Sequence, residues 1–158
     1  RRANAVTPVA AIQNRYSMIA RDYEPLFPVL EELNVALVAF SPMGNGFLSG
    51  AYNASSTFAE GIDYRSHMPQ YTKEGFDAAK ELLDYLAALG REKNVTSGQL
   101  SLAWMLCKKP YIIPIPGSRK EQRILENLGA KDVVLSAEEI AKIDGLLDSL
   151  DMPAYGRR

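Results

Sequence analysis

Three short apolar runs, separated by stretches with helical spacing, constrain the fold of this chain more than any other feature. They lie at residues 9–13, 35–40 and 111–115, and each has the length of a strand. The run at 35–40 is apolar at every position, which is typical of a parallel strand covered on both faces. Strands that alternate with helices predict an α/β fold with a parallel sheet. Three strands are few for that class, so the pattern favours part of a larger sheet or barrel over a finished domain.

The helices are predicted from the spacing of apolar residues and from signals at their ends. Pro28 suits the first turn of a helix after the first strand, and Asn34 suits its left-handed end. Between Phe76 and Leu89 apolar residues recur every three or four positions, which predicts one helix that ends near Gly90.

Capping boxes predict three more helices, because each places Ser or Thr three residues before Glu or Gln. They lie at residues 96–99, 118–121 and 136–139. The first of these helices is apolar all round and is expected to be buried, and Gly129 is expected to end the second. Residues 41–72, with four glycines, and the tail from 152 to 158 are expected to be irregular.

Composition excludes several classes of function. The 18 Lys and Arg balance 19 Asp and Glu, so we expect neither nucleic acid nor an anionic membrane as a partner. No apolar stretch approaches the ~20 residues of a membrane helix. Cys107, the single cysteine, lies in an apolar run and predicts a buried thiol in a reducing, cytoplasmic compartment. With one cysteine and one histidine, we expect no metal site.

Ligands of α/β folds bind beyond the carboxyl ends of the strands, and the segment after the third strand has the clearest chemistry there. It begins a helix, whose first N–H groups and dipole favour an anion. Gly117 allows close approach of a ligand, Ser118 offers a hydroxyl, and three cations follow in Arg119, Lys120 and Arg123. This pattern indicates an anion site, although a solvated basic helix start explains it equally well.

The ends of the first two strands offer weaker signals. The glycines at 44–46 suit either a phosphate-binding loop or an ordinary Asn-Gly turn. Gln13 could orient a carboxamide ligand or satisfy loop backbone, and Phe40 could stack on a planar ring or belong to the core. His67 is the only histidine, and its loop position suits a surface residue better than a catalyst.

Taken together, these segments resemble the C-terminal half of an aldo-keto reductase, in order and over nearly the whole chain. Residues 13–17, Gln-Asn-Arg-Tyr-Ser, resemble the Gln-x-x-Tyr-Ser stretch of the sixth barrel strand. Residues 40–50 resemble the aromatic-Ser-Pro-Leu-x-x-Gly block after the seventh strand. Ile-Pro-Gly-Ser at 115–118, with the downstream residues at 123 and 126–127, resembles the block after the eighth and suggests the glycine-type bacterial and plant branch.

The resemblance implies that residues 1–158 are a single partial domain, the C-terminal half of a TIM (β/α)8 barrel with about three parallel strands and surrounding helices. A whole barrel needs about 250 residues. The parent protein would reduce aldehydes or ketones, its small-molecule carbonyl substrates, with NADPH. The resemblance implies that Gln13 hydrogen-bonds the nicotinamide carboxamide and that Phe40 stacks on the nicotinamide ring. It implies that the pyrophosphate is held by Ser41, Met43, Gly44, Asn45 and Gly46. It also implies that the 2′-phosphate is surrounded by Gly117, Ser118, Arg119 and Arg123, and that the adenine is bound by Glu126 and Asn127.

Three positions depart from the family pattern. Phe40 stands where Tyr is more usual, Arg15 where an acidic residue is common, and Gly117 where other branches have Lys. Nothing in the chain matches the catalytic tetrad of Asp, Tyr, Lys and His, so no catalytic residue is assigned and the isolated chain is expected to be inactive. The alternative is a non-enzymatic nucleotide-binding or channel β-subunit-like module. A further alternative is the self-association of two copies through open strand edges.

Overall fold

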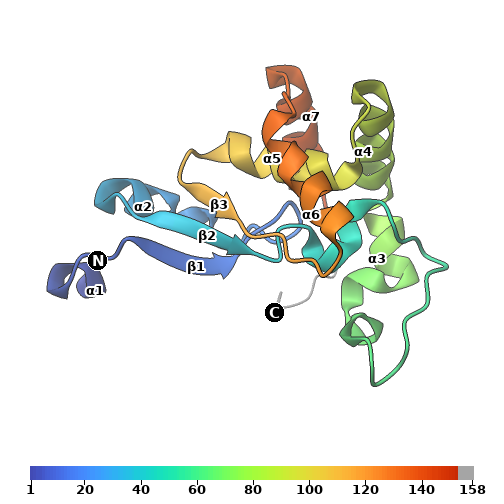
Figure 1. Ribbon diagram of the computed structural model, residues 1–158, viewed down its shortest axis with the longest axis horizontal. Coiled ribbons are helices and arrows are strands. Elements are labelled where there is room, and N and C mark those ends of the chain that lie inside the picture. Colours follow the sequence, from blue (N-terminus) through green and yellow to red (C-terminus); the bar gives the residue numbers. More distant parts are fainter. Residues whose placement is uncertain (153–158) are drawn as a thin grey trace.

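A computed structural model of the chain, which describes residues 1–152, has a three-stranded parallel sheet at its centre (Figure 1). The strands are β1 (Ala11–Arg15), β2 (Ala36–Phe40) and β3 (Ile112–Pro114), hydrogen-bonded in the order β1-β2-β3. The predicted α/β class and its three parallel strands are confirmed. Residues 153–158, most of the tail expected to be irregular, lie outside the described residues.

One face of the sheet is packed and the other is open. On β2, Leu37 and Ala39 are fully buried, whereas Phe40 on the opposite face is 40% exposed. The prediction that this strand is covered on both faces is therefore wrong for residues 1–152, because the apolar cover comes only from the helices on one side. The open face also carries Gln13 and Arg15, since their partners in register are Val38 and Phe40.

Seven α-helices are described, and Figure 1 shows α4, α5 and α7 gathered on one side of the sheet. Their bounds are α1 (Arg2–Val6), α2 (Phe27–Leu33), α3 (Lys73–Ala78), α4 (Lys80–Lys93), α5 (Ser97–Lys108), α6 (Glu121–Leu128) and α7 (Ala137–Asp148). Short 3-10 turns interrupt the connections at η1 (Glu24–Leu26), η2 (Gly44–Ser49), η3 (Tyr64–His67), η4 (Pro69–Tyr71) and η5 (Gly129–Asp132). The stretch expected to be wholly irregular thus contains three of these turns, and α1 had no predicted counterpart.

Several predicted helix ends are confirmed. Pro28 lies in the first turn of α2, and Asn34 ends that helix with a φ of 54°. Thr96 and Ser136 form complete capping boxes, in which the side chain accepts the N–H of the third helical residue. The glutamine or glutamate at that residue accepts the backbone N–H of the cap in return, so two unpaired donors are satisfied at each helix start.

The helix predicted over residues 76–90 has different limits. It is divided at Ala79 into α3 and α4, and α4 continues past Gly90 to Lys93. Asn94 ends it instead, with a left-handed φ of 56°. Gly90 has a packing role, because a Cβ there would lie 2.7 Å from the carbonyl oxygen of Val95.

The two signals predicted for the ends of α6 have different outcomes: the cap predicted at Ser118 is wrong, and Gly129 is confirmed as the residue that ends the helix. Lys120 occupies its N-cap position without a side-chain bond, while Ser118 lies outside the helix and accepts the Lys120 N–H at 3.0 Å. Gly129 is right-handed, with a φ of −61°, and the chain continues into η5 rather than turning away. At the start of α6, the hydroxyl of Ser118 is therefore satisfied by a tighter turn than the capping box predicted.

The core lies between the sheet and α5, where the expected burial of α5 is confirmed from Gly98 to Met105. Trp104 is fully buried, stacks on Tyr16 and donates its indole N–H to Asp144 at 2.8 Å. Cys107 is exposed, so the predicted burial of this thiol is wrong: it lies in the last turn of α5, beyond the end of the buried run. No described helix is long and apolar enough to cross a membrane.

Candidate functional site

The turn after β2 has an unusual backbone. Ser41 and Asn45 have φ values of 52° and 62°, and the glycines at 44 and 46 are also left-handed. Positive φ is uncommon outside glycine and costs free energy, so it persists where the surroundings hold it. Here the Tyr71 hydroxyl donates to the carbonyl of Asn45 at 3.0 Å and so stabilises the conformation of the turn. Turns that combine right- and left-handed residues can form backbone concavities that bind anions, although here the N–H groups of Gly44 and Gly46 already donate to the carbonyls of Ser41 and Met43.

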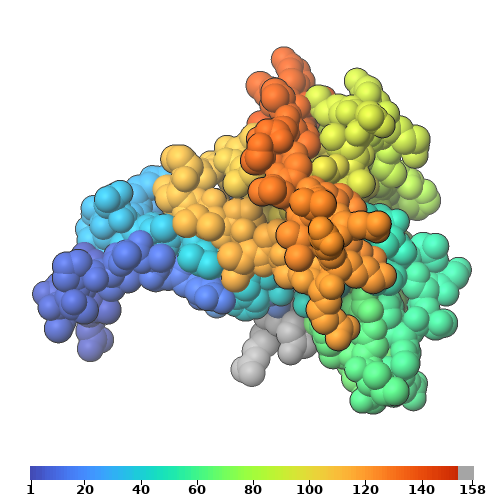
Figure 2. All heavy atoms as spheres, in the orientation of Figure 1, coloured from blue at the N-terminus to red at the C-terminus, as the bar shows by residue number. Residues whose placement is uncertain are grey.

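The segment after β3 forms the opposite wall. Ile115 donates its N–H to Ala39 at 3.0 Å, which keeps the chain beside β2 before it turns into α6. Gly117 is exposed, and a Cβ there would meet nothing within 4 Å. Figure 2 shows the α6 segment and the loop after β2 side by side on one face of the molecule.

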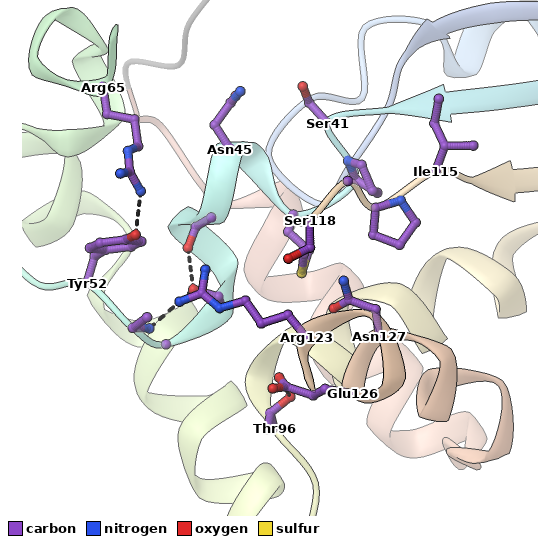
Figure 3. A pocket seen from close by; sticks show the side chains of 18 of the residues that line it. Ser41, Asn45, Tyr52, Arg65, Thr96, Ile115, Ser118, Arg123, Glu126 and Asn127 are labelled. Carbon is purple, nitrogen blue, oxygen red and sulfur yellow. Dashed lines mark hydrogen bonds between the residues drawn. The ribbon is translucent and has the colours of Figure 1, made fainter. Parts of the chain in front are cut away.

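A pocket of about 530 Å³ lies between these two walls (Figure 3). Its size is within the usual range for cofactor sites. Nine of the predicted site residues line it, namely Ser41, Met43, Asn45, Gly46, Gly117, Ser118, Arg123, Glu126 and Asn127. The structure therefore brings together two segments that are more than sixty residues apart in the sequence.

The remaining predicted residues, Gln13, Phe40, Gly44 and Arg119, do not line this pocket. Phe40 and Gln13 are on the open face of the sheet, and Phe40 lines a neighbouring pocket of about 710 Å³. Gly44 is buried beneath the turn, where a Cβ would lie 2.6 Å from the end of the Ile19 side chain. Arg119 is exposed and is not among the lining residues of either pocket.

Two donors on α6 have no partner among the described residues. The Arg123 side chain extends from the helix across the pocket toward η2, and no hydrogen bond or ion pair holds its guanidinium (Figure 3). The amide nitrogen of Asn127 is buried and unpaired. Buried polar groups are nearly always hydrogen-bonded, so this nitrogen indicates an acceptor supplied by a ligand or by water. The arrangement suits an anion beside Arg123 and a polar ring beside Asn127.

The start of α5 holds α6 in place. The Thr96 hydroxyl, besides capping its own helix, donates to the Glu126 carboxylate at 2.8 Å. The Gln99 side chain donates to the Glu126 carbonyl at 2.9 Å. The capping box at 96–99 therefore also orients one side of the pocket. Within residues 1–152, no cluster of His, Cys, Asp and Glu side chains could hold a metal ion.

The loop after η2 contributes lining residues that the sequence did not predict, in particular Tyr52, Tyr64 and Arg65. Arg65 forms an ion pair with Asp63, donates to the Tyr52 hydroxyl and lies 4.8 Å from the centre of the Tyr52 ring. The hydrogen bond from Arg65 lowers the pKa of Asp63. Two signals were available in the sequence: the length of this loop, because long loops in compact domains are usually functional, and the resemblance of the stretch with Arg65 and Pro69 to the family.

Comparison with known proteins identifies the chain's relatives. The model of the Aldo/keto reductase family matches residues 1–148. Aldo-keto reductase str7 of Strobilurus tenacellus is 38% identical over 97% of this chain and 46% of its own length. Aldo-keto reductase yakc (NADP(+)) of Schizosaccharomyces pombe is 39% identical over 96% of this chain and 46% of its own length. The chain thus spans about half the length of these relatives.

Solved structures agree with this assignment. A glycerol dehydrogenase from Gluconobacter oxydans matches 93% of this chain and 45% of its own, with a TM-score of 0.83 and 25% identity. A thermostable aldo-keto reductase in complex with the inhibitor epalrestat matches 88% of this chain and 40% of its own, with a TM-score of 0.61 and 25% identity. The open sheet and its helices match part of a (β/α)8 barrel, as predicted. The chain belongs to the aldo/keto reductase family.

Proposed function

We propose that this chain is the cofactor-binding, C-terminal half of a cytoplasmic, NADPH-dependent aldo-keto reductase that reduces aldehydes or ketones to alcohols. The observation that carries the proposal is the pocket in which the left-handed turn at 41–46 faces the unpaired donors of α6. The printed name of the Schizosaccharomyces pombe relative, which includes NADP(+), supports the same cofactor.

The residues present fit this cofactor. Ser118 and Arg123 would bind the 2′-phosphate, because a guanidinium forms charge-assisted hydrogen bonds with phosphate. Arg119, exposed one residue beyond Ser118, would reach the same phosphate from the solvent side. The buried amide of Asn127 would donate to the adenine, beside the Glu126 carboxylate that Thr96 holds. The turn at 41–46 would hold the pyrophosphate.

The nicotinamide end would extend onto the open face of the sheet. Phe40 would stack on the nicotinamide ring and Gln13 would hydrogen-bond its carboxamide, from adjacent strands on the same face. The bound cofactor supplies hydride to the carbonyl carbon. No tetrad residue is assigned within this chain, so proton transfer to the carbonyl oxygen is assigned to the other half of the barrel.

Titration with NADPH, followed by fluorescence, tests the site in the 158-residue chain. We expect Arg123→Ala to weaken NADPH binding about 10- to 100-fold and to leave NADH binding nearly unchanged, because only NADPH carries the 2′-phosphate. Arg91→Ala, which removes an exposed arginine of α4, is the matched control and should bind as the wild type does.

Equal NADPH affinity of the wild type and the Arg123 variant would refute the phosphate assignment. The same preparation, mixed with NADPH and an activated aldehyde, should bind the cofactor without oxidising it. Turnover well above the blank would show that a catalytic group had been missed in this chain. Binding without turnover, even after the chain is joined to a complete N-terminal half, would favour the non-enzymatic nucleotide-binding module.

A further inference from the structure

The second pocket, of about 710 Å³, adjoins the proposed cofactor site. The two share Ser41, Asn45 and Tyr64 as lining residues. Its walls are largely aromatic and apolar, with Phe40 and Tyr23 each 40% exposed. A planar apolar molecule would therefore find stacking surfaces in it, directly beside the position proposed for the nicotinamide ring.

A cationic side chain, that of Arg15, lines this pocket. It is the last residue of β1 and the register partner of Phe40, so the two side chains leave adjacent strands on the same open face. Neighbouring strands are about 4.8 Å apart, which places the guanidinium stem immediately next to the Phe40 ring. An anionic group on a molecule that packs against Tyr23, beside the nicotinamide ring that Phe40 would hold, would thus meet Arg15.

The hydrogen-bonding capacity of Arg15 is unused. Its side chain is only 18% exposed, and within residues 1–152 its one polar contact is an ion pair with Asp22 at 3.7 Å, too long for a hydrogen bond. A guanidinium has five N–H donors, and a largely buried one without acceptors is unusual. Asp22 balances part of its charge, so the site favours a single negative charge over a dianion.

From this geometry, and resting on the reductase function proposed above, we infer that Arg15 binds a carboxylate of the carbonyl substrate. The preferred substrates are then aldehydes or ketones in which an apolar or aromatic body carries both the carbonyl group and a carboxylate. The aromatic walls hold the body, and bidentate hydrogen bonds from Arg15 to the carboxylate set its orientation. Arg15 is thus assigned as a specificity-determining residue.

The test compares 4-formylbenzoate with its methyl ester in the complete barrel that contains this chain, with NADPH as reductant. The wild type should have a higher kcat/KM for the carboxylate than for the ester. Arg15→Ala should lower kcat/KM for the carboxylate about 10- to 100-fold, mainly through KM, and change that for the ester less than twofold. Arg15→Lys, which keeps the charge without the bidentate fork, should recover part of the preference.

The outcomes separate this inference from the proposed function. Unchanged turnover of the ester by Arg15→Ala shows that the barrel still folds, and Arg91→Ala should match the wild type on both substrates. If Arg15→Ala slows both substrates equally, or slows neither, the guanidinium has only its ion pair with Asp22 and the inference is overturned while the reductase function stands. If the wild type reduces neither aldehyde and does not bind NADPH, the proposed function fails and this inference falls with it.

Discussion

At the scale of single residues, the burial of Tyr111 makes the stability of the fold depend on pH. Its hydroxyl lies 3.0 Å from the Glu31 carboxylate, next to the Lys109 ammonium at 2.6 Å from the same oxygen. Burial, together with the hydrogen bond to Glu31, raises the pKa of Tyr111 to about 12. The neutral phenol is therefore favoured in the folded chain, and its contribution to stability is complete below the ordinary value of about 10 and is lost as the pH rises to 12.

Tyr111→Phe tests this contribution. The variant should be less stable than the wild type at pH 8 by about 1 kcal/mol, the usual net value of one hydrogen bond. The difference in free energy of unfolding, measured with urea, should shrink between pH 10 and pH 12. Burial also raises the pKa values of Tyr16 and Tyr71. Both residues are present in the variant and in the wild type, so the difference in stability between the two proteins depends on Tyr111 alone. A difference that stays constant up to pH 12 would contradict the assignment.

At the scale of secondary-structure elements, the two confirmed capping boxes offer a matched pair. Thr96 caps α5 and also bonds Glu126 in the pocket, whereas Ser136 caps α7 and bonds only α7 residues. Thr96→Ala and Ser136→Ala should each lower the free energy of unfolding by about 1 kcal/mol. Only Thr96→Ala should also weaken NADPH binding, because it alone releases the Glu126 side chain.

Chemical denaturation and cofactor titration of the two variants and of Thr96→Ser measure both effects. Thr96→Ser keeps the hydroxyl and should restore both properties to near the wild-type values. Equal NADPH affinity of Thr96→Ala and Ser136→Ala would show that the start of α5 does not orient the pocket.

Helix ends were predictable from sequence where one side chain decides them. Thr96 and Ser136 satisfy their own helices, and Asn34 tolerates the left-handed conformation better than most residues. Ser118 has the same capping spacing, yet here its hydroxyl closes a turn two residues long before the helix begins. Helix α3 packs against η4, and there is no room for a Cβ at position 75 because the carbonyl of Gln70 lies against Gly75. We attribute the break at Ala79 to this packing. Such tertiary contacts are not readable from spacing.

At the scale of the whole molecule, the open face and the two free strand edges are the surfaces most available for association with another chain. Within residues 1–152, β1 and β3 each pair with β2 alone (Figure 1). Ile113 and Ile115 are 49% and 43% exposed beside the free edge of β3. Unpaired edges with apolar neighbours pair readily with other chains, so the isolated chain should self-associate as its concentration rises.

A charged substitution on the open face tests this expectation. Ile113→Lys should shift the chain toward monomer in size-exclusion chromatography with light scattering, because an inward-pointing charge opposes edge pairing. Val134→Lys is the matched control, since Val134 is 79% exposed and lies away from the sheet. Its mass distribution should equal that of the wild type. A wild type that stays monomeric at all concentrations would refute the expectation.

The sequence predicted which segments form the pocket better than it predicted the open sheet face and the loop beside the pocket. Nine of the residues predicted from the polar segments after the apolar runs and from the family resemblance line one pocket, because parallel strands end at one edge of a sheet. The open face was not predictable, since an apolar strand such as 35–40 has the same composition whether or not a second layer covers it. Tyr52 and Arg65 were missed because the stretch that carries them has no repeating apolar spacing from which contacts can be inferred.

The walls of the proposed cofactor pocket come from η2, from the start of α5 and from α6, segments that belong to distant parts of the chain. A nucleotide bound there would contact all three segments and would stabilise their packing against one another. Binding and folding are then one linked equilibrium: a ligand present at a hundredfold excess over its dissociation constant adds about 2.7 kcal/mol to the native state. Cellular levels of the dinucleotide would in this way govern how long the half-barrel survives proteolysis.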